Sequence, residues 1–229
     1  MKVLFSLITI VTILFSCTKK QNTSFFGKID GLSKGTIYLQ QVKDSSLVTL
    51  DSISLNGSNQ FNFNFDLSEP DVFLFHLDKK DGTIFNDRLK MFLAPGKNEF
   101  YANLKDFKKT VKITGSPNQI KLKEYESMIQ KFNMDDFKLT KLNQLAKKTG
   151  KEKFVDATLT DYDRFLKRKY LYIVNFVMNN KNSEIAPYIT VTEIPDANPK
   201  YLDTIYKSLP ENIKASKYGI KLKELGSNK

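Results

Sequence analysis

Apolar and polar residues alternate along the chain from Phe25 to Gly115, and turn residues interrupt this pattern at short intervals. Alternation with a period of two is typical of strands that bury one face. About seven or more short strands separated by turns predict an antiparallel β-sandwich or barrel. The strands are expected at residues 36–40, 48–55, 61–65, 72–77, 89–93, 99–104 and 110–113.

Some of these segments also predict how the strands are placed. In residues 61–65, Phe61, Phe63 and Phe65 alternate with asparagines, so we expect the phenylalanines on the inner face of the sandwich. An aromatic platform for a sugar or a base is the alternative. Residues 72–77 are apolar on both faces, which predicts a central strand. Asn56-Gly57-Ser58-Asn59 between two strands predicts a hairpin turn.

At Ser116-Pro117 the period changes to 3.6, as in helices that bury one face. Serine as the N-cap and proline at the first helical position predict that a helix begins there. Thr160-Asp161-Tyr162-Asp163 resembles a capping box and predicts the start of a second long helix. The apolar face of that helix is expected to consist of Leu159, Tyr162, Leu166, Tyr170, Ile173 and Val177. Shorter helices are expected at residues 185–194, 198–209, 210–216 and 218–225.

The two periodicities together predict a segregated α+β fold. We expect a β-sandwich domain at residues 25–115. A small helical bundle with short connections is expected at residues 116–229.

The start of the chain resembles a secretory signal peptide. Lys2 precedes an apolar run at residues 3–15, which is too short to span a bilayer at about 1.5 Å per residue. Ser16 is followed by Cys17, the only cysteine, and a small residue before a cysteine is typical of sites that bacteria cleave and acylate. We therefore expect a signal peptide at residues 1–16, lipid attachment at Cys17 and a lipidated tether at residues 17–24. An ordinary secreted protein and an uncleaved anchor are the alternatives.

A lipid on Cys17 would hold the protein in the cell envelope, because several acyl chains bind a membrane far more firmly than one. Thr18-Lys19-Lys20-Gln21 lacks the acidic cluster that often follows the cysteine of surface-exported lipoproteins. We therefore expect the periplasmic face of the outer membrane.

The formal net charge is +11 at pH 7, which raises the possibility of a nucleic-acid partner. Arginine makes the bidentate contacts that phosphates and bases favour, but the basic residues here are lysines apart from Arg88, Arg164 and Arg168. Acidic residues also lie among the lysines. We therefore expect a solvated lysine-rich surface and no nucleic-acid partner; attraction to anionic lipid or polysaccharide is the alternative.

The residues that could carry chemistry form no catalytic pattern. His76 is the only histidine, and one histidine provides neither a zinc site nor, without a serine on a sharp turn, a catalytic triad. Two carboxylate pairs, Asp135-Asp136 and Asp161/Asp163, could do acid–base work or hold calcium, but structural roles are favoured. Asp135-Asp136 is expected in a helix–helix connection. Asp161 and Asp163 are expected at a helix start, where acids stabilise the macrodipole. No phosphate-binding loop, dinucleotide fingerprint or EF-hand loop occurs. We therefore predict no catalytic residues, no metal, no cofactor and no enzymatic activity.

Two tripeptides, Asp51-Ser52-Ile53 and Asp203-Thr204-Ile205, resemble an acceptor for periplasmic O-glycosylation in some lipoprotein-rich bacteria. Ser52 and Thr204 are therefore candidate glycosylation sites. The hypothesis predicts an intact mass above that of the bare lipidated chain.

Several short motifs follow one another in an order that is specific when they are taken together. They are Phe26–Leu32, Gly35–Leu39, Asp51–Ile53, Phe61–Phe63, Phe92–Gly96 and Ile113–Ser116. Over Phe25 to about Ser127 the chain resembles a domain of unknown function (number 4369) found in bacterial lipoproteins. Residues 201–225 are similar to the segment that usually follows this domain. The resemblance implies a thioredoxin-like domain next, with a pair of cysteines spaced by two residues; neither is found here, so no redox residue is carried over.

These observations lead us to expect a non-enzymatic, membrane-tethered lipoprotein that acts as a binding or scaffold module. The alternative is an accessory subunit that works in trans with a separate thioredoxin-like redox protein. A truncated remnant of a redox enzyme is a third possibility. The expected partners are the membrane, through the lipid, and an envelope protein or a thioredoxin-like protein.

Overall fold

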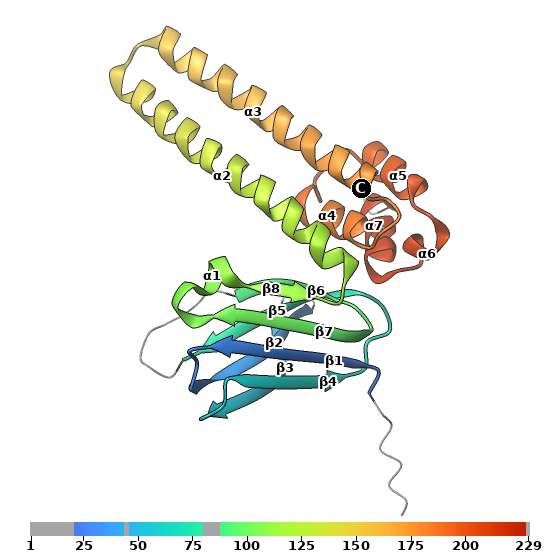
Figure 1. The fold of residues 1–229 in the computed structure, drawn as a ribbon. Coiled ribbons are helices and arrows are strands. Elements are labelled where there is room, and N and C mark those ends of the chain that lie inside the picture. Colours follow the sequence, from blue (N-terminus) through green and yellow to red (C-terminus); the bar gives the residue numbers. More distant parts are fainter. Residues whose placement is uncertain (1–20, 44–45, 80–87, 228–229) are drawn as a thin grey trace, which may run out of the picture.

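The structure, a computed structural model, describes residues 21–43, 46–79 and 88–227 (Figure 1). The predicted signal peptide at residues 1–16, Cys17 and the start of the tether lie outside the described residues. A β-sandwich is followed by helices, so the predicted α+β fold is confirmed. Within the described ranges, no helix combines the length and the apolar character that a membrane crossing requires.

The sandwich consists of two four-stranded sheets. Neighbouring strands are antiparallel, as predicted, except for β1 and β7, which are parallel. The chain enters β7 from the opposite sheet, so no tight hairpin imposes an antiparallel direction on this pair. The first sheet has the order β4 (Gln60–Phe65), β1 (Thr23–Asp30), β7 (Gly96–Asn103), β8 (Lys112–Thr114), and the second has the order β3 (Ser46–Asn56), β2 (Lys34–Lys43), β5 (Asp71–Asp78), β6 (Arg88–Leu93).

The turn at Asn56–Asn59 connects the two sheets, so the predicted hairpin pairing is wrong. β3 already pairs with β2 as far as Asn56, which lies opposite Lys34. The amide of Gly57 donates to the carbonyl of Ser33 over 2.7 Å and holds the chain at this crossing. β4 then pairs with β1, where its phenylalanines can enter the core.

The core of the sandwich is aromatic, and it confirms the inner-face prediction for β4. Phe61 and Phe63 are buried, and the ring centre of Phe61 lies 5.7 Å from that of Phe75 in the opposite sheet. Phe75 in turn stacks on Phe100 with ring centres 4.7 Å apart. β5 lies between β2 and β6, so the central strand predicted at residues 72–77 is also confirmed.

The helices form a long hairpin and a compact group at its base (Figure 1). A 3-10 turn, η1 (Leu104–Asp106), and a short helix, α1 (Phe107–Thr110), precede β8. The hairpin consists of α2 (Pro117–Thr149) and α3 (Glu152–Asn179), and it projects away from the sandwich. The group at its base consists of α4 (Ile185–Glu193), α5 (Pro199–Ser208), α6 (Glu211–Lys214) and α7 (Lys217–Ser227).

Some predicted helix boundaries are confirmed and others are wrong. Ser116 is the N-cap of α2, as predicted. However, α2 continues through Asp135-Asp136, where a connection was expected, and ends at Thr149 with Gly150 as its C-cap. α3 begins at Glu152, so Thr160–Asp163 lies inside this helix and is not a capping box. Continuous packing between two long helices outweighs a local capping signal.

The buried face of α3 is also rotated relative to the prediction. Ile173 and Val177 are buried as expected, but Leu159 and Leu166 are exposed and Phe165 is buried instead. Over its distal half, α3 has only α2 as a neighbour, whereas the predicted bundle would have covered a broader stripe (Figure 1). A two-helix contact buries a narrow seam and leaves the flanking leucines in solvent.

β6 connects the two cores of the molecule. Met91 and Leu93 point into the sandwich core, while Phe92, between them, belongs to the helical core. Alternate residues of a strand point to opposite faces, so one short strand supplies both cores. This arrangement seats the helices on the outer face of the second sheet.

Candidate functional site

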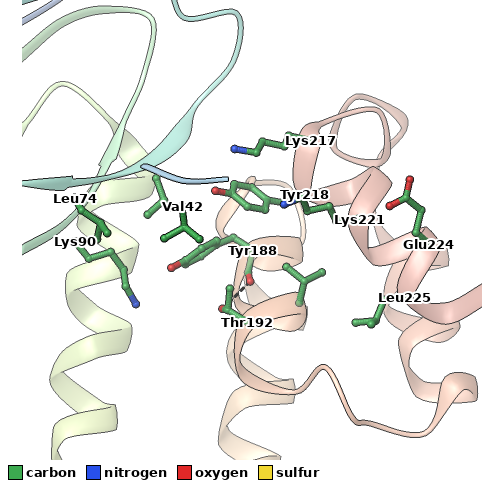
Figure 2. A pocket seen from close by; sticks show the side chains of 12 residues that line it. Val42, Leu74, Lys90, Tyr188, Thr192, Lys217, Tyr218, Lys221, Glu224 and Leu225 are labelled. Carbon is green, nitrogen blue, oxygen red and sulfur yellow. Dashed lines mark hydrogen bonds between the residues drawn. The ribbon is translucent and has the colours of Figure 1, made fainter. Parts of the chain in front are cut away.

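A groove with a volume of about 690 Å³ lies between the second sheet and the helices α4 and α7 (Figure 2). Outward-pointing residues of β2, β5 and β6 form one wall, and residues spaced by three or four positions on α4 and α7 form the other. Most of these side chains are apolar or aromatic, with lysines among them. The lining residues are Val42, Val72, Leu74, Lys90, Tyr188, Val191, Thr192, Lys217, Tyr218, Lys221, Glu224 and Leu225.

The carboxylate of Asp71, at the start of β5, fixes α7 against the sheet. It accepts hydrogen bonds from the Tyr218 hydroxyl over 2.6 Å, from Lys217 Nζ over 2.6 Å and from Gln41 Nε2 over 2.9 Å. The Asp71 side chain is only 10% exposed, so these donors replace water as its partners. The carboxylate of Glu69 also accepts from the backbone amide of Lys217, at the first residue of α7.

Three aromatic rings join the sheet to both helices of the groove. Phe92 of β6 meets Tyr188 edge-on, with ring centres 5.7 Å apart, and lies 6.3 Å from Tyr218. Tyr188 and Tyr218 meet edge-on at 5.0 Å. Edge-on contacts between buried rings are favourable, so this cluster forms a stable inner end of the groove.

Lys90 lines the sheet side of the groove and keeps its charge. Burial on its own would lower the pKa of Lys90, but the nearby Tyr188 and Glu126 outweigh this effect and raise it. Lys90 Nζ lies 4.0 Å from the Glu126 carboxylate. Burial raises the pKa of Glu126, and Lys90 partly opposes this change.

The start of α2 is attached to the edge of β6. The backbone amide of Phe92 donates to the side-chain oxygen of Gln119 over 2.6 Å, which satisfies a buried group at the sheet edge. Asn118 accepts from the amide of Ile185 over 3.1 Å and donates to Glu184 over 2.7 Å, which holds α4 beside α2. The two walls of the groove are therefore fixed relative to each other.

Asp71 and Tyr218 are held in fixed hydrogen-bonding roles at the groove. Burial, and then the charge of Asp71, raise the pKa of Tyr218 far above its usual range, so its hydroxyl remains a donor. Asp71 already accepts three hydrogen bonds from neighbouring side chains. Among the residues that the structure describes, no cluster of histidine, cysteine and carboxylate side chains could hold a metal ion.

The candidate residues from the sequence lie outside this groove. His76 is on the outer face of β5 and stacks on Tyr38 with ring centres 5.7 Å apart, a contact that suits a structural role. Ser52 is exposed on β3; Thr204 is exposed on α5, where its hydroxyl donates to the carbonyl of Lys200 over 2.7 Å. Their glycosylation stays a prediction, and Cys17 lies outside the described part of the chain.

The aspartate pairs lie on the two helices of the hairpin, away from the places predicted for them. Asp135 is near Arg168, with 3.6 Å between Asp135 Oδ2 and Arg168 Nη2. Asp161 is near Arg164, at 3.3 Å. One aspartate of each pair therefore lies beside a cation, while Asp136 of the first pair interacts with the hydroxyl of Tyr162.

The residues that build the groove were not singled out in the sequence. Asp71 and Tyr218 are 147 positions apart, and neither belongs to a recognisable motif. Pro70, before Asp71, is typical of a turn before a strand and points to no contact with a distant helix. The pairing depends on how α7 packs on the sheet, which no local spacing encodes.

Comparisons with known proteins agree with the sequence motifs. No curated protein gives a significant match. The crystal structure of transthyretin from Sparus aurata is similar over 42% of this chain and 96% of its own, with 9% sequence identity and a TM-score of 0.28, which is too low to support any conclusion. A family model described as "Domain of unknown function (DUF4369)" matches residues 24–122. The predicted resemblance is therefore confirmed over residues 24–122, which run from the first strand into the start of α2 and match the DUF4369 family model.

Proposed function

We propose that this protein is a non-enzymatic binding module of the cell envelope and that its ligand occupies the groove between the sandwich and α4/α7. The observation that carries the proposal is the groove itself, which has apolar walls from both parts of the fold. Ligand pockets are typically concave and mostly apolar, with a few polar groups that orient the ligand. A volume of about 690 Å³ is in the usual range for a small molecule.

The polar groups of the groove suggest the chemistry of the ligand. Lys217 is paired with Asp71, and Lys90 has Glu126 beside it. Lys221 and Glu224 of α7 lie exposed at the rim, and neither forms an ion pair with any residue in the described ranges. A ligand with an apolar body and one anionic group would place the body against Val72 and Leu74 and the anion near Lys221.

A fluorescent probe with the same chemistry tests the proposal. 1-Anilinonaphthalene-8-sulfonate has apolar rings and one sulfonate, and we expect it to bind the full chain with enhanced fluorescence. Val42 lines the groove and is exposed, so Val42→Glu should fold normally and weaken binding by about tenfold or more, because it puts a carboxylate into an apolar wall and repels the sulfonate. Leu50→Glu, at an exposed position of neighbouring β3 that neither lines the groove nor lies opposite Val42, is the matched control. Equal binding by both variants would place the probe elsewhere and contradict the proposal.

The envelope location depends on the proposed lipid at Cys17. We expect the wild-type chain to fractionate with membranes and Cys17→Ser to be released from them. An intact mass that shows an unmodified, uncleaved N-terminus would contradict lipid attachment without affecting the groove.

The alternative function is that of an accessory subunit for a separate thioredoxin-like redox protein. The match of residues 24–122 to DUF4369 supports it, because the resemblance implies a thioredoxin-like neighbour, while Cys17 is the only cysteine of this chain. In-cell crosslinking of the full-length protein followed by mass spectrometry distinguishes the two functions. Recovery of a protein with two cysteines spaced by two residues favours the accessory role; recovery of envelope proteins alone favours the stand-alone binding module.

A further inference from the structure

The distal half of the α2/α3 hairpin extends beyond every other helix (Figure 1). α2 has 33 residues and is therefore about 50 Å long. Its seam with α3 is closed by aromatic pairs such as Phe132 with Phe165, whose ring centres are 6.1 Å apart, and Phe132 with Tyr172 at 5.4 Å. The face of α2 that points away from this seam is not covered by α3.

On that opposite face, residues spaced by three or four positions form a stripe that contains only lysines and large apolar side chains. We call it the outer stripe of α2. All its members are exposed, including Met134 (58%), Phe137 (61%) and Leu145 (54%). The outer stripe consists of Lys131, Met134, Phe137, Lys138, Lys141, Leu142, Leu145 and Lys148.

The lysines of the outer stripe are mostly without counter-charges. Lys138 is 3.9 Å from Asp135, while Lys141 lies over the ring of Phe137, 4.4 Å from its centre. Lys131 and Lys148 form no ion pair with the residues that the structure describes. Exposed apolar residues surrounded by unpaired charges of one sign are typical of an interaction surface.

The outward face of α3 provides an internal comparison. It carries Asp156 and Asp163 among Lys153, Arg164 and Lys167, which is the mixed pattern of a solvated helix face. Leu171 is an exposed large apolar residue on that face. The absence of acids and the clustering of apolar residues therefore distinguish the outer stripe of α2 from an ordinary solvent-facing surface.

We propose that the outer stripe of α2 is a docking surface for an acidic amphipathic helix of another protein. Such a helix would cover Met134, Phe137 and Leu145 with its apolar face, and its flanking carboxylates would meet the lysines. This would complete a three-helix arrangement where the hairpin has only two helices. The surface is separate from the groove, so the proposal does not depend on the proposed function.

Two other occupants fit the stripe less well. A second copy of this chain would bring the same lysines together, at a cost from like-charge repulsion. A flat bilayer would meet the sandwich, which lies on the side of α2 that faces away from α3 (Figure 1). A single helix is narrow enough to lie along the stripe without this obstruction.

Fluorescence anisotropy of a labelled synthetic peptide tests the proposal with the full chain. The probe is a 21-residue helix with leucine at heptad positions a and d and glutamate at the flanking positions; its twin carries lysine in place of glutamate. We expect the glutamate peptide to bind, the lysine peptide to bind at least about tenfold more weakly, and both to be sensitive to salt. We expect Phe137→Ser with Leu145→Ser, and separately Lys138→Glu with Lys141→Glu and Lys148→Glu, each to weaken binding of the glutamate peptide by about tenfold or more.

The matched control is Lys153→Glu with Lys167→Glu and Leu171→Ser on the outward face of α3, which should leave binding within about twofold. Because all these side chains are exposed, circular dichroism should show unchanged folding for each variant. No binding of the glutamate peptide, or equal binding by all variants, would overturn the proposal. Binding of the stripe to vesicles of phosphatidylglycerol and phosphatidylcholine (1:1) with no peptide binding would also overturn it, in favour of a membrane surface.

Discussion

The hydroxyl of Tyr218 on α7 donates a hydrogen bond of 2.6 Å to the carboxylate of Asp71, at the start of β5. This contact crosses the boundary between the sandwich and the helical part, and both residues are buried. It holds the last helix of the chain in place as one wall of the groove.

Tyr218→Phe should lower the free energy of unfolding by about 1.5–3 kcal/mol, because a buried charged acceptor loses one of its donors. The smaller end of this range applies if Lys217 and Gln41, the other donors, still satisfy the Asp71 carboxylate. Urea unfolding followed by circular dichroism measures the change. Tyr201→Phe, at an exposed position of α5, is the control and should change the stability by less than about 0.5 kcal/mol.

Stability should fall as the pH rises above about 10, partly because of Tyr218. Burial and Asp71 raise the pKa of this hydroxyl in the folded state, so the folded protein keeps a proton that the unfolded chain releases near pH 10. The contribution of Tyr218 to the free energy of unfolding is complete below about pH 10. Above that pH it is lost at a slope of up to about 1.4 kcal/mol per pH unit. Unfolding curves between pH 9 and 11 should therefore be less steeply pH-dependent for Tyr218→Phe than for the wild type; parallel curves would contradict this explanation.

Gln119→Ala should destabilise the protein by about 1–3 kcal/mol, because the buried amide of Phe92 loses its acceptor at the edge of β6. Hydrogen exchange gives a local readout: the Phe92 amide should exchange faster in the variant than in the wild type. Gln144→Ala, at an exposed position of the same helix, should change neither quantity. Unchanged protection of Phe92 in Gln119→Ala would show that this hydrogen bond does not hold the edge.

Gly115→Ala and Gly57→Ala should differ in cost although both glycines have positive φ, at +109° and +82°. A Cβ at Gly57 would meet nothing within 4 Å, so only the backbone strain of about 1–2 kcal/mol applies. A Cβ at Gly115 would meet the carbonyl oxygen of Lys97 and would lie 2.7 Å from Asn98 Cα. We therefore expect Gly115→Ala to be the more destabilising by at least about 1–3 kcal/mol in denaturant unfolding. Equal losses of stability in the two variants would mean that the backbone around Lys97 can move away from the added Cβ.

Phe165→Ala should cost about 3–5 kcal/mol and Leu166→Ala less than about 0.5 kcal/mol, although the two are neighbours in sequence. Phe165 is 2% exposed in the seam of the hairpin, whereas Leu166 is 45% exposed beside it. Thermal unfolding of both variants checks the corrected face of α3. A large loss for Leu166→Ala would mean that this face is covered, as the predicted bundle required.

The local pattern of the sequence determined much of the fold. Alternation located the strands, including the buried phenylalanines of β4 and the central position of β5, because a pleated strand with one buried face requires that alternation. Ser116-Pro117 located the start of α2, since an N-cap followed by proline acts within a single turn. The short motifs of the sandwich also indicated the resemblance to DUF4369 that the family model shows over residues 24–122.

Only the tertiary structure decided which elements meet. The turn at Asn56–Asn59 has the composition of a hairpin turn, but β4 pairs in the other sheet, where its phenylalanines are buried. Thr160–Asp163 resembles a capping box but continues a helix, because α2 provides a partner along that length. The contact of Asp71 with Tyr218, and with it the groove, depends on residues 147 positions apart. Periodicity and capping describe interactions within a few residues, whereas these pairings are decided by which buried surfaces cover one another.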